Sequence, residues 1–394
     1  MNVASLAAGY LRARPLNTAL SLLLLALGVG TIAMLLLVVD QLEERMGREA
    51  RGIDLVVGAK GSPMQLILSG IYHVDAPTGN IPLAAVQVLQ NNRFVKKAIP
   101  LALGDGWKGF RIVGAGHEYV EHYGAKLAAG RLWQKPMEVV LGAEVAARTG
   151  AGVGATFVGA HGIGGDGATH ADDPYAIVGL LAPNGTVLDR LVLTAIESVW
   201  QIHEEHSERN EQEKREITVL LVQYASPLAA ATLPRQINSQ SELQAASPAY
   251  ETARLFRIVG VGVEALRAFA AVLILAAALS VFIALTHALE ERRYDLAVMR
   301  TLGASPARLF GLLLAEALLL SAVGAVLGLA LGHGFAAAFG AWLEAEQHVA
   351  VTGLAWRAEE LWLPVIALGV GLAAALIPAW RAYRTEVARI LAQG

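Results

Sequence analysis

The chain has 394 residues, of which 55% are hydrophobic and 16% are charged. Soluble domains carry about 25% charged residues, so we expect much of this chain to lie in a lipid bilayer. The net charge of −3 argues against a nucleic-acid partner. The absence of cysteine excludes disulfides, thiolate metal sites and cysteine nucleophiles.

Four segments have the length and apolar character of membrane-spanning helices, which need about 20 apolar residues each. They are residues 16–39, 268–289, 309–331 and 361–380. The first contains no charge. Its length and its lack of a small-residue cleavage site favour an anchor over a removed signal peptide.

Basic residues flank these four segments on one side of the membrane. They are Arg12, Arg14, Arg292, Arg293, Arg300, Arg308, Arg381, Arg384 and Arg389. The positive-inside rule therefore predicts that both termini are cytoplasmic. The region between the first two spans then lies outside, in the periplasm of a Gram-negative cell.

That outer region is predicted to be mixed α and β, because short β-branched runs alternate with helical patterns. The predicted strands are residues 53–57, 139–141, 156–158, 176–181 and 217–222, and the predicted helices are residues 84–91 and 142–148. The polar stretch 203–216 is interpreted as an exposed helix end that continues into a mobile loop. The fold class is thus an α-helical membrane protein with four transmembrane helices and a large α+β extracytoplasmic domain between helices 1 and 2.

A short segment between the second and third spans, residues 290–308, has a helical pattern of its own. Its apolar positions are Leu296, Val298, Met299 and Leu302, and its basic positions are Arg292, Arg293 and Arg300. Gly303 follows where a helix stop is expected. A plain basic loop that obeys the positive-inside rule is the alternative, but the apolar periodicity favours an amphipathic helix.

Two features of the third span concern helix packing. Gly324, Gly328 and Gly332 recur every four residues, and such a face permits close helix approach either within the chain or in a homodimer. Glu316 lies inside the span, where an unpaired carboxylate is expensive. We favour a structural hydrogen bond to Ser280, Thr286, Ser321 or a backbone carbonyl over a proton-relay role, because no chain of titratable groups accompanies it.

Histidines in the outer region give a weak indication of a metal site. His161 and His170 lie in a glycine-rich, acidic stretch, and His203 and His206 would share one helix face. Imidazoles with carboxylates suit zinc, nickel or copper. A solvated polar loop is the favoured alternative, because the spacings match no defined site.

These features together resemble the permease subunits of MacB/FtsX-like ABC transporters, the type VII mechanotransmission class, over nearly the whole chain. The resemblance rests on AAGYLRARPLNTALSLLLLALGVG near the N-terminus, GRLWQKPMEVVLGAEVAARTGAGVGATF in the outer region, ERRYDLAVMRTLGAS after the second span, and the tail IPAWRAYRTEVARIL. The tail departs from the family at Thr385–Glu386, where a proline is usual.

The resemblance implies a domain plan. Residues 1–39 would form an N-terminal elbow helix and the first transmembrane helix, and residues 40–264 a MacB-like periplasmic core domain. Residues 265–394 would form transmembrane helices 2–4, with residues 290–308 as the cytoplasmic coupling helix. The implied location is the bacterial inner membrane.

The resemblance also implies partners. The nearest string to a GxxxxGK[ST] phosphate loop is GAKGS, residues 58–62, which lacks the spacing. We therefore expect no catalytic residues and no cofactor in this chain, with ATP and Mg²⁺ bound by a separate cytoplasmic ABC ATPase subunit. A second permease copy, giving a homodimer, and a periplasmic soluble partner are also expected. Some members of this class accompany histidine-rich secreted partners, which keeps zinc as a hypothesis.

Three functions follow from this interpretation. The first is a permease subunit that couples ATP hydrolysis to movements of its periplasmic domain, acting on a lipoprotein, lipid, peptide or metal-linked cargo. The alternative is an FtsX-like regulator of a cell-wall hydrolase. A membrane-bound enzyme is disfavoured, because Ser62, Ser69 and the histidines lack a recognisable catalytic context.

Overall fold

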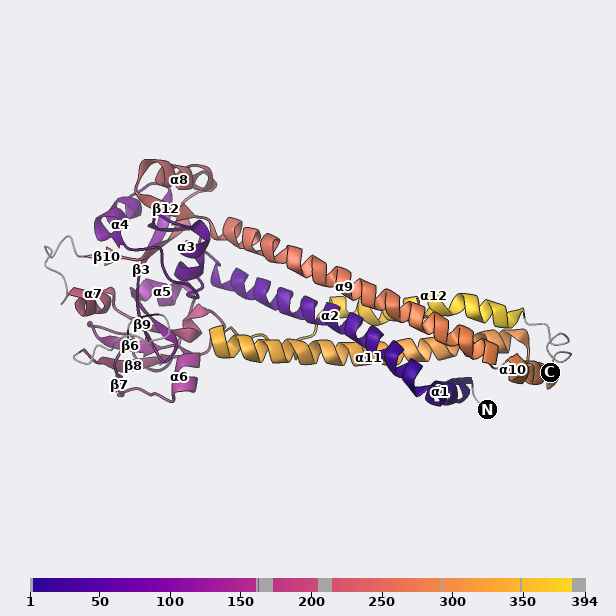
Figure 1. The fold of residues 1–394 in the computed structure, drawn as a ribbon. Coiled ribbons are helices and arrows are strands. Elements are labelled where there is room, and N and C mark those ends of the chain that lie inside the picture. The colour runs from indigo at the N-terminus through magenta and orange to yellow at the C-terminus, as the bar shows by residue number, and fades with distance from the viewer. Residues whose placement is uncertain are drawn as a thin grey trace. The chain divides into compact units, whose positions relative to one another are not determined.

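The structure, a computed structural model, describes residues 3–160, 162, 173–204, 215–291, 293–347 and 349–384. It divides into two compact units (Figure 1). The first, here called the helical unit, comprises Met1–Leu42 and Val259–Gly394. The second, here called the outer domain, comprises Glu43–Ile258.

Long apolar helices build the helical unit. Its elements are α1 (Val3–Ala13), α2 (Pro15–Glu49), α9 (Pro248–Glu291), α10 (Arg293–Thr301), α11 (Pro306–Gln347), η2 (Ala358–Leu361) and α12 (Trp362–Tyr383). Proline is the first residue of α2, α9 and α11, a position where its missing N–H has no cost. Within the described part of the chain, α2, α9, α11 and the η2–α12 segment are long and apolar enough to cross a membrane. Each predicted span lies inside one of them.

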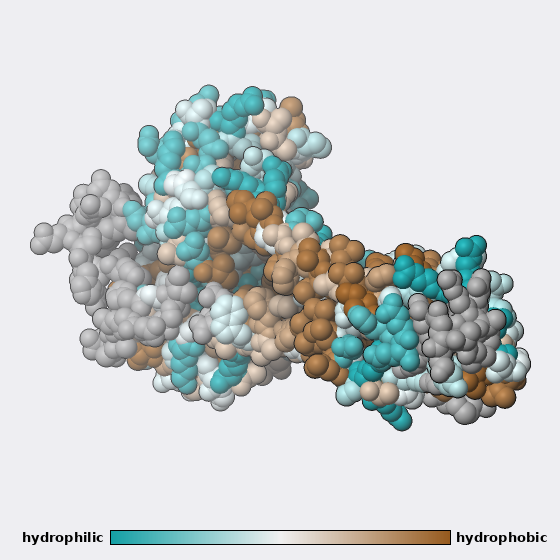
Figure 2. Space-filling view, turned by 45° about the vertical axis from the view of Figure 1, so that its right-hand side comes forward, coloured by the Kyte–Doolittle hydropathy of each residue, from teal (hydrophilic) through white to brown (hydrophobic). Residues whose placement is uncertain are grey.

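The surface of the helical unit agrees with a lipid environment. Large apolar side chains remain exposed on α2, α9, α11 and α12, among them Leu20, Leu275, Val326 and Ile377. Figure 2 shows such hydrophobic residues as brown surface on the visible face of the unit. The predicted fold class, four transmembrane helices with a large α+β domain between the first and second, is confirmed.

The connection between α11 and α12 is fixed to the helices around it. Gln41 on α2 exchanges two hydrogen bonds of 2.9 Å with the backbone of Thr352. The His333 ring on α11 lies between the Gly353 carbonyl oxygen at 2.6 Å and the Glu360 carboxylate at 2.8 Å. Residues 352–360 are therefore held against α2 and α11 by these hydrogen bonds.

A mixed ten-stranded sheet forms the centre of the outer domain. Its order is β12-β1-β11-β3-β4-β9-β6-β8-β5, with β7 paired to β8. The strands are β1 (Leu55–Ala59), β3 (Val95–Trp107), β4 (Phe110–Ala115), β5 (Leu127–Gly130), β6 (Glu138–Leu141), β7 (Thr156–Phe157), β8 (Tyr175–Leu181), β9 (Leu191–Thr194), β11 (Val219–Tyr224) and β12 (Leu243–Ala246). The pairs β4–β9 and β6–β8 are parallel, and β2 (Ile81–Pro82) pairs separately with β10 (Glu216–Ile217).

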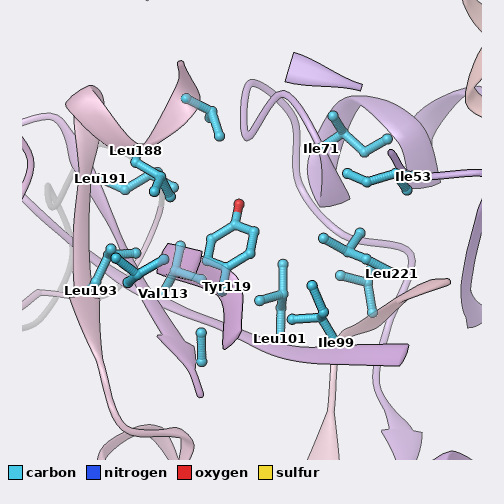
Figure 3. Packing of buried hydrophobic residues seen from close by; sticks show 14 of the residues in the cluster. Ile53, Ile71, Ile99, Leu101, Val113, Tyr119, Leu188, Leu191, Leu193 and Leu221 are labelled. Atoms are coloured by element: carbon cyan, nitrogen blue, oxygen red, sulfur yellow. The ribbon is translucent and has the colours of Figure 1, made fainter. Parts of the chain in front are cut away.

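Helices cover both faces of this sheet. They are α3 (Pro63–Gly70), α4 (Leu83–Gln90), α5 (His117–His122), α6 (Ala143–Thr149), η1 (Val187–Arg190), α7 (Ile196–Glu204) and α8 (Pro227–Gln240). Side chains alternate between the faces along each strand, so Val56 faces one core while Leu55 and Val57 face another. The core on the first face, under α3 and α5, is continuous, and Figure 3 shows the Tyr119 ring inside it. The opposite face has two separate cores, one with α4 and α8 and one with α6 and α7.

Most predicted outer-domain elements match observed ones. The predicted strands at 139–141, 156–158 and 176–181 correspond to β6, β7 and β8, and residues 217–222 include parts of β10 and β11. The strand predicted at 53–57 begins two residues later as β1, after Gly52 with φ +76°. The predicted helices correspond to α4 and α6.

Candidate functional site

The candidate coupling segment forms a separate short helix, α10, between α9 and α11. It ends in a Schellman motif: the Ala304 N–H donates to the Met299 carbonyl at 2.9 Å, and the Gly303 N–H donates to Arg300 at 3.1 Å. Gly303 has φ +95°, a conformation that favours glycine. The sequence therefore specifies both the short helix and the turn that leads into α11.

The side chains of α10 point in different directions. Ala297 is fully buried, and Met299 packs against the core of the helical unit beside Leu285, Leu289 and Leu313. Val298 and Arg300 are half-buried. Tyr294 and Leu302 are 58% and 82% exposed. One side of the segment is thus attached to the helices, and the other leaves an aromatic and an apolar side chain exposed.

Three of the predicted coupling residues cannot be placed in this way. Arg292 lies outside the described residues, and so do the side chains of Arg293 and Leu296. Their predicted contacts with an ATPase remain predictions.

The N-terminal helix α1 is tied to the end of α9 next to α10. Arg14, which follows α1, forms an ion pair with Glu291 and donates to the Ala284 carbonyl at 3.5 Å. The Thr18 hydroxyl donates to the Leu11 carbonyl at 2.9 Å, which fixes the bend between α1 and α2. The turn between α1 and α2 is therefore linked to the end of α9 that precedes α10.

Glu316 is 4% exposed and lines a cavity of about 30 Å³ together with Tyr10, Asn17 and Thr18. Two of its predicted partners have hydroxyl contacts elsewhere. Ser280 pairs with Ser21 at 2.8 Å, and Thr286 donates to the Phe282 carbonyl at 2.8 Å. The structural role that we predict for Glu316 stays a prediction.

The glycine face of α11 packs against α2 of the same chain. A Cβ added at Gly324 would lie 2.7 Å from Leu25, and one at Gly328 would lie 2.7 Å from Val29. A Cβ at Gly332 would lie 2.6 Å from Ala33. The sequence left open an intrachain or a homodimer contact for this face, and the structure uses it within the chain.

The metal hypothesis falls on residues that the structure does not describe. His161, His170 and His206 lie outside the described residues, and His203 belongs to α7 but its side chain is not described. Within the described ranges, no group of three or more His, Asp or Glu side chains could hold a metal ion. Zinc binding stays a prediction.

A groove of about 770 Å³ opens on the outer domain. It lies where the parallel strands β4 and β9 end and the helices α5 and α7 begin, the edge at which α/β sheets commonly bind ligands. Its lining includes Trp133, Trp200, His117, Lys135, Glu118 and Glu197. Aromatic rings beside charged groups of both signs suit an amphipathic ligand such as a peptide.

A buried polar cluster at the end of α2 was not found from the sequence. Arg190 forms a bidentate pair with Glu49, with N–O distances of 2.7 and 2.9 Å. The two residues are 6% and 2% exposed. They are separated by 141 positions in the chain, with Glu49 in a polar stretch and Arg190 in a mostly apolar one. No spacing rule could have paired them.

These features define a class: a multi-pass membrane protein with one large α+β domain between its first two membrane helices. The model for the MacB-like periplasmic core domain matches residues 18–240, and the model for the FtsX-like permease C-terminal matches residues 267–387. Since the first match alone spans more than half of the 394 residues, the chain belongs to the MacB/FtsX-like permeases of ABC transporters.

Two solved structures are similar to about half of the chain. One is the extracellular domain of the noncanonic ABC-type transporter YknZ from Gram-positive bacteria, with 12% identity and a TM-score of 0.30 over 49% of this chain and 98% of that one. The other is a domain of a putative permease protein from Porphyromonas gingivalis, with 16% identity and a TM-score of 0.30 over 49% of this chain and 89% of that one. No curated protein matches the chain.

Proposed function

We propose that this permease subunit couples ATP hydrolysis by a separate cytoplasmic ATPase subunit to movements of its outer domain. The observation that supports this most is the form of α10, a separate helix that is attached on one side and exposed on the other. A connector between two membrane helices needs only a few turn residues. An exposed leucine and tyrosine at this point suit a groove on a protein partner.

The covalent path from α10 supports a mechanical role. Met299 packs on the core that α9 and α11 share, so a displacement of α10 changes contacts on both helices. Helix α9 has 44 residues and is therefore about 66 Å long, more than twice the roughly 30 Å of a bilayer core. It is long enough to carry such a displacement out of the membrane.

We further propose that two copies associate through α9. The glycine face of α11 is occupied by α2, so a dimer needs another surface. On α9, the exposed residues Phe269, Val272, Leu279 and Ile283 lie three, seven and four positions apart, which places them on one face, as two-stranded helix packing requires. We expect a cysteine replacing Val272 to form a disulfide-linked dimer in membranes, while one replacing Val326 on α11 does not.

We propose the outer-domain groove as the contact point for the cargo or for a periplasmic partner. A lipoprotein, a lipid, a peptide or a metal-linked protein remain the candidate classes. The mixture of two tryptophans with charged groups favours an amphipathic segment of a polypeptide. The alternative of an FtsX-like regulator of a cell-wall hydrolase would use the same surface without moving a cargo.

Co-purification tests the proposal. The tagged chain is extracted from its native membrane in mild detergent, and its companions are identified and quantified by mass spectrometry. We expect a stoichiometric ABC-type ATPase with the wild type. Leu302→Glu should remove the ATPase, whereas Leu354→Glu should retain it, because Leu354 is similarly exposed but lies between α11 and α12. Wild-type protein that carries no ATPase would contradict the coupling function.

A further inference from the structure

Two of the long membrane helices are joined to neighbouring strand ends of the outer-domain sheet. Strand β1 begins six residues after α2 ends, and β12 ends two residues before α9 begins. Since β1 and β12 are antiparallel neighbours, with Val56 opposite Ala246, the start of one lies beside the end of the other. Helices α2 and α9 therefore enter the outer domain at one edge of its sheet.

At this edge, side chains of the outer domain satisfy the last carbonyls of α2. A helix end leaves carbonyls without intrahelical partners. The Tyr123 hydroxyl donates to the Glu49 carbonyl at 2.7 Å, and the Tyr72 hydroxyl lies 3.4 Å from the Met46 carbonyl. The His122 ring lies 3.0 Å from the carbonyl of Arg51, just beyond the helix. Tyr72 follows α3, His122 is the last residue of α5, and Tyr123 comes directly after α5.

A buried charge pair fixes the same turn of α2. The Glu49 carboxylate accepts two hydrogen bonds from Arg190 and one of 3.1 Å from Arg45. Arg190 also donates to the Tyr72 carbonyl at 2.9 Å, which links the pair to the tyrosine. Burial and the neighbouring Arg190 charge lower the pKa of Arg45, because both disfavour its charged form. The Glu49 carboxylate acts in the opposite direction, since it pairs with both cations.

The same tyrosine reaches the other helix. The Tyr72 hydroxyl lies 3.0 Å from the Thr252 hydroxyl, in the second turn of α9. Tyr72 is 3% exposed, and so its hydroxyl contacts are shielded from water. One side chain of the outer domain thus contacts both helices.

We propose that Glu49, Arg190 and Tyr72 form a rigid joint that fixes the end of α2 and the start of α9 to the outer domain. The joint holds the last turn of α2, the first turns of α9 and the sheet edge together as one rigid body within the outer domain. This inference rests on the proposed mechanical function for its use, but the rigidity of the joint is a property of this chain alone.

Hydrogen exchange on the full-length chain in lipid nanodiscs tests the rigidity. We expect Glu49→Gln to accelerate amide exchange in residues 46–53 and 249–254 by a factor of about ten or more, because an unpaired buried Arg190 destabilises the joint locally. The matched control is Glu138→Gln. Glu138 also forms a bidentate pair, with Arg131 at 2.7 Å, but contacts neither helix. Glu138→Gln should leave the exchange rates of those amides within about twofold of the wild-type rates.

A milder variant separates loss of the joint from loss of the fold. Tyr123→Phe removes one hydroxyl and should accelerate the same amides by about threefold or more while the central strands keep their protection. If Glu49→Gln increases exchange through the whole outer domain, it has destabilised the fold as well as the joint. The exchange of the same amides in Tyr123→Phe then decides whether the joint is rigid. Unchanged exchange at residues 46–53 in both variants would overturn the proposal.

Spectroscopy gives an independent measurement, because the chain contains no cysteine to interfere with labelling. Nitroxides on cysteines replacing Arg48 and Val88, both exposed residues of the outer domain, report one distance between α2 and α4. We expect a narrow distance distribution that Glu49→Gln broadens and Glu138→Gln leaves unchanged. An equally broad distribution in the wild type would overturn the joint. Neither experiment requires the ATPase. If no ATPase binds, the proposed joint is unaffected, and only its proposed role in coupling is contradicted.

Discussion

Helix α2 is held by two different kinds of contact along its length. Between Leu25 and Ala33 it packs against the glycine face of α11, with no charged group in the contact. At Glu49 it is held by a buried ion pair and by tyrosine hydroxyls. The first contact belongs to the helical unit and the second to the outer domain.

The difference follows from the surroundings of each contact. In lipid, helices gain nothing from burying apolar side chains, so close backbone approach through glycine provides the attraction. In the outer domain water is the competing solvent, and a helix end can be fixed by directional polar contacts if every charge is paired. One helix therefore combines a close apolar contact in the helical unit with a polar contact that fixes its end in the outer domain.

The largest expected effect comes from breaking the buried pair. Arg190→Met leaves the Glu49 carboxylate without its bidentate partner in a site that water does not reach. Removing one member of a buried pair costs about 3–5 kcal/mol, which should lower the melting temperature of the outer domain by about 10 °C. Differential scanning calorimetry of the full chain in detergent measures it.

A double variant sharpens this prediction. Glu49→Leu with Arg190→Met replaces both charges with apolar groups, so the folded state no longer contains an unpaired ion. We expect the double variant to recover at least half of the lost melting temperature. A double variant less stable than Arg190→Met would show that the pair itself, and not the unpaired charge, determines stability.

The next effect concerns the glycine contact. Gly328→Ala places a methyl group against Val29 and the Ala26 carbonyl, and such overpacking costs about 1–3 kcal/mol. Gly334→Ala on the same helix is the matched control, because open space surrounds Gly334 and alanine is the better helix former. Thermal denaturation in detergent should show Gly328→Ala less stable and Gly334→Ala equal to or more stable than the wild type. Equal melting temperatures for the two variants would contradict the α2–α11 contact.

The sequence predicts the helical unit well because hydropathy alone constrains it. Twenty apolar residues in a row have few alternatives in a bilayer, and the segment around Met299 and Gly303 combines helical periodicity with a stop signal. The helices nevertheless extend beyond the predicted spans: α9 begins at Pro248 and not near residue 268. Hydropathy reports where a helix is in lipid, and it does not report where the helix ends.

The outer domain is less predictable from the sequence, for physical reasons. Strands β4 and β9 pair in parallel with about 80 residues between them, and neither has the alternating pattern of a half-buried strand, since both are buried on two faces. The joint is harder still, because Glu49 and Arg190 meet only through tertiary structure. Only the pattern of long-range contacts distinguishes them from the many surface glutamates and arginines.

A pH-dependent effect is expected from His73 in the outer domain. Burial, with Arg111 and Arg190 nearby, holds the pKa of His73 well below its usual value of 6.5. Above pH 6.5 the ring is neutral in both the folded and unfolded states. As the pH falls below 6.5, only the unfolded chain takes up the proton, so stability decreases by up to about 1.4 kcal/mol per pH unit.

His73→Asn should reduce this acid sensitivity, since asparagine tolerates the φ of +54° found at this position and does not titrate. Melting temperatures at pH 7 and pH 5 measure the slope for each protein. A His73→Asn protein as acid-sensitive as the wild type would show that other groups carry the effect.

The smallest effect distinguishes the two bidentate pairs of the outer domain. Arg131 and Glu138 match Arg190 and Glu49 in geometry, but the Arg131 side chain is 45% exposed. Its hydrogen bonds lower the pKa of Glu138 to about 2. The stabilisation from this lowered pKa is therefore complete above about pH 4.5 and is lost as the pH falls toward 2.

Arg131→Ala should lower the melting temperature at pH 7 by much less than Arg190→Met does. Removal of the half-exposed Arg131 lets water reach the Glu138 carboxylate, whereas removal of Arg190 leaves Glu49 in a site that water does not reach, so the charge left unpaired costs less at Glu138. Arg131→Ala should also flatten the loss of stability between about pH 4.5 and 2, because the Glu138 pKa returns toward its ordinary range. Equal destabilisation by Arg131→Ala and Arg190→Met at pH 7 would show that burial does not distinguish the pairs.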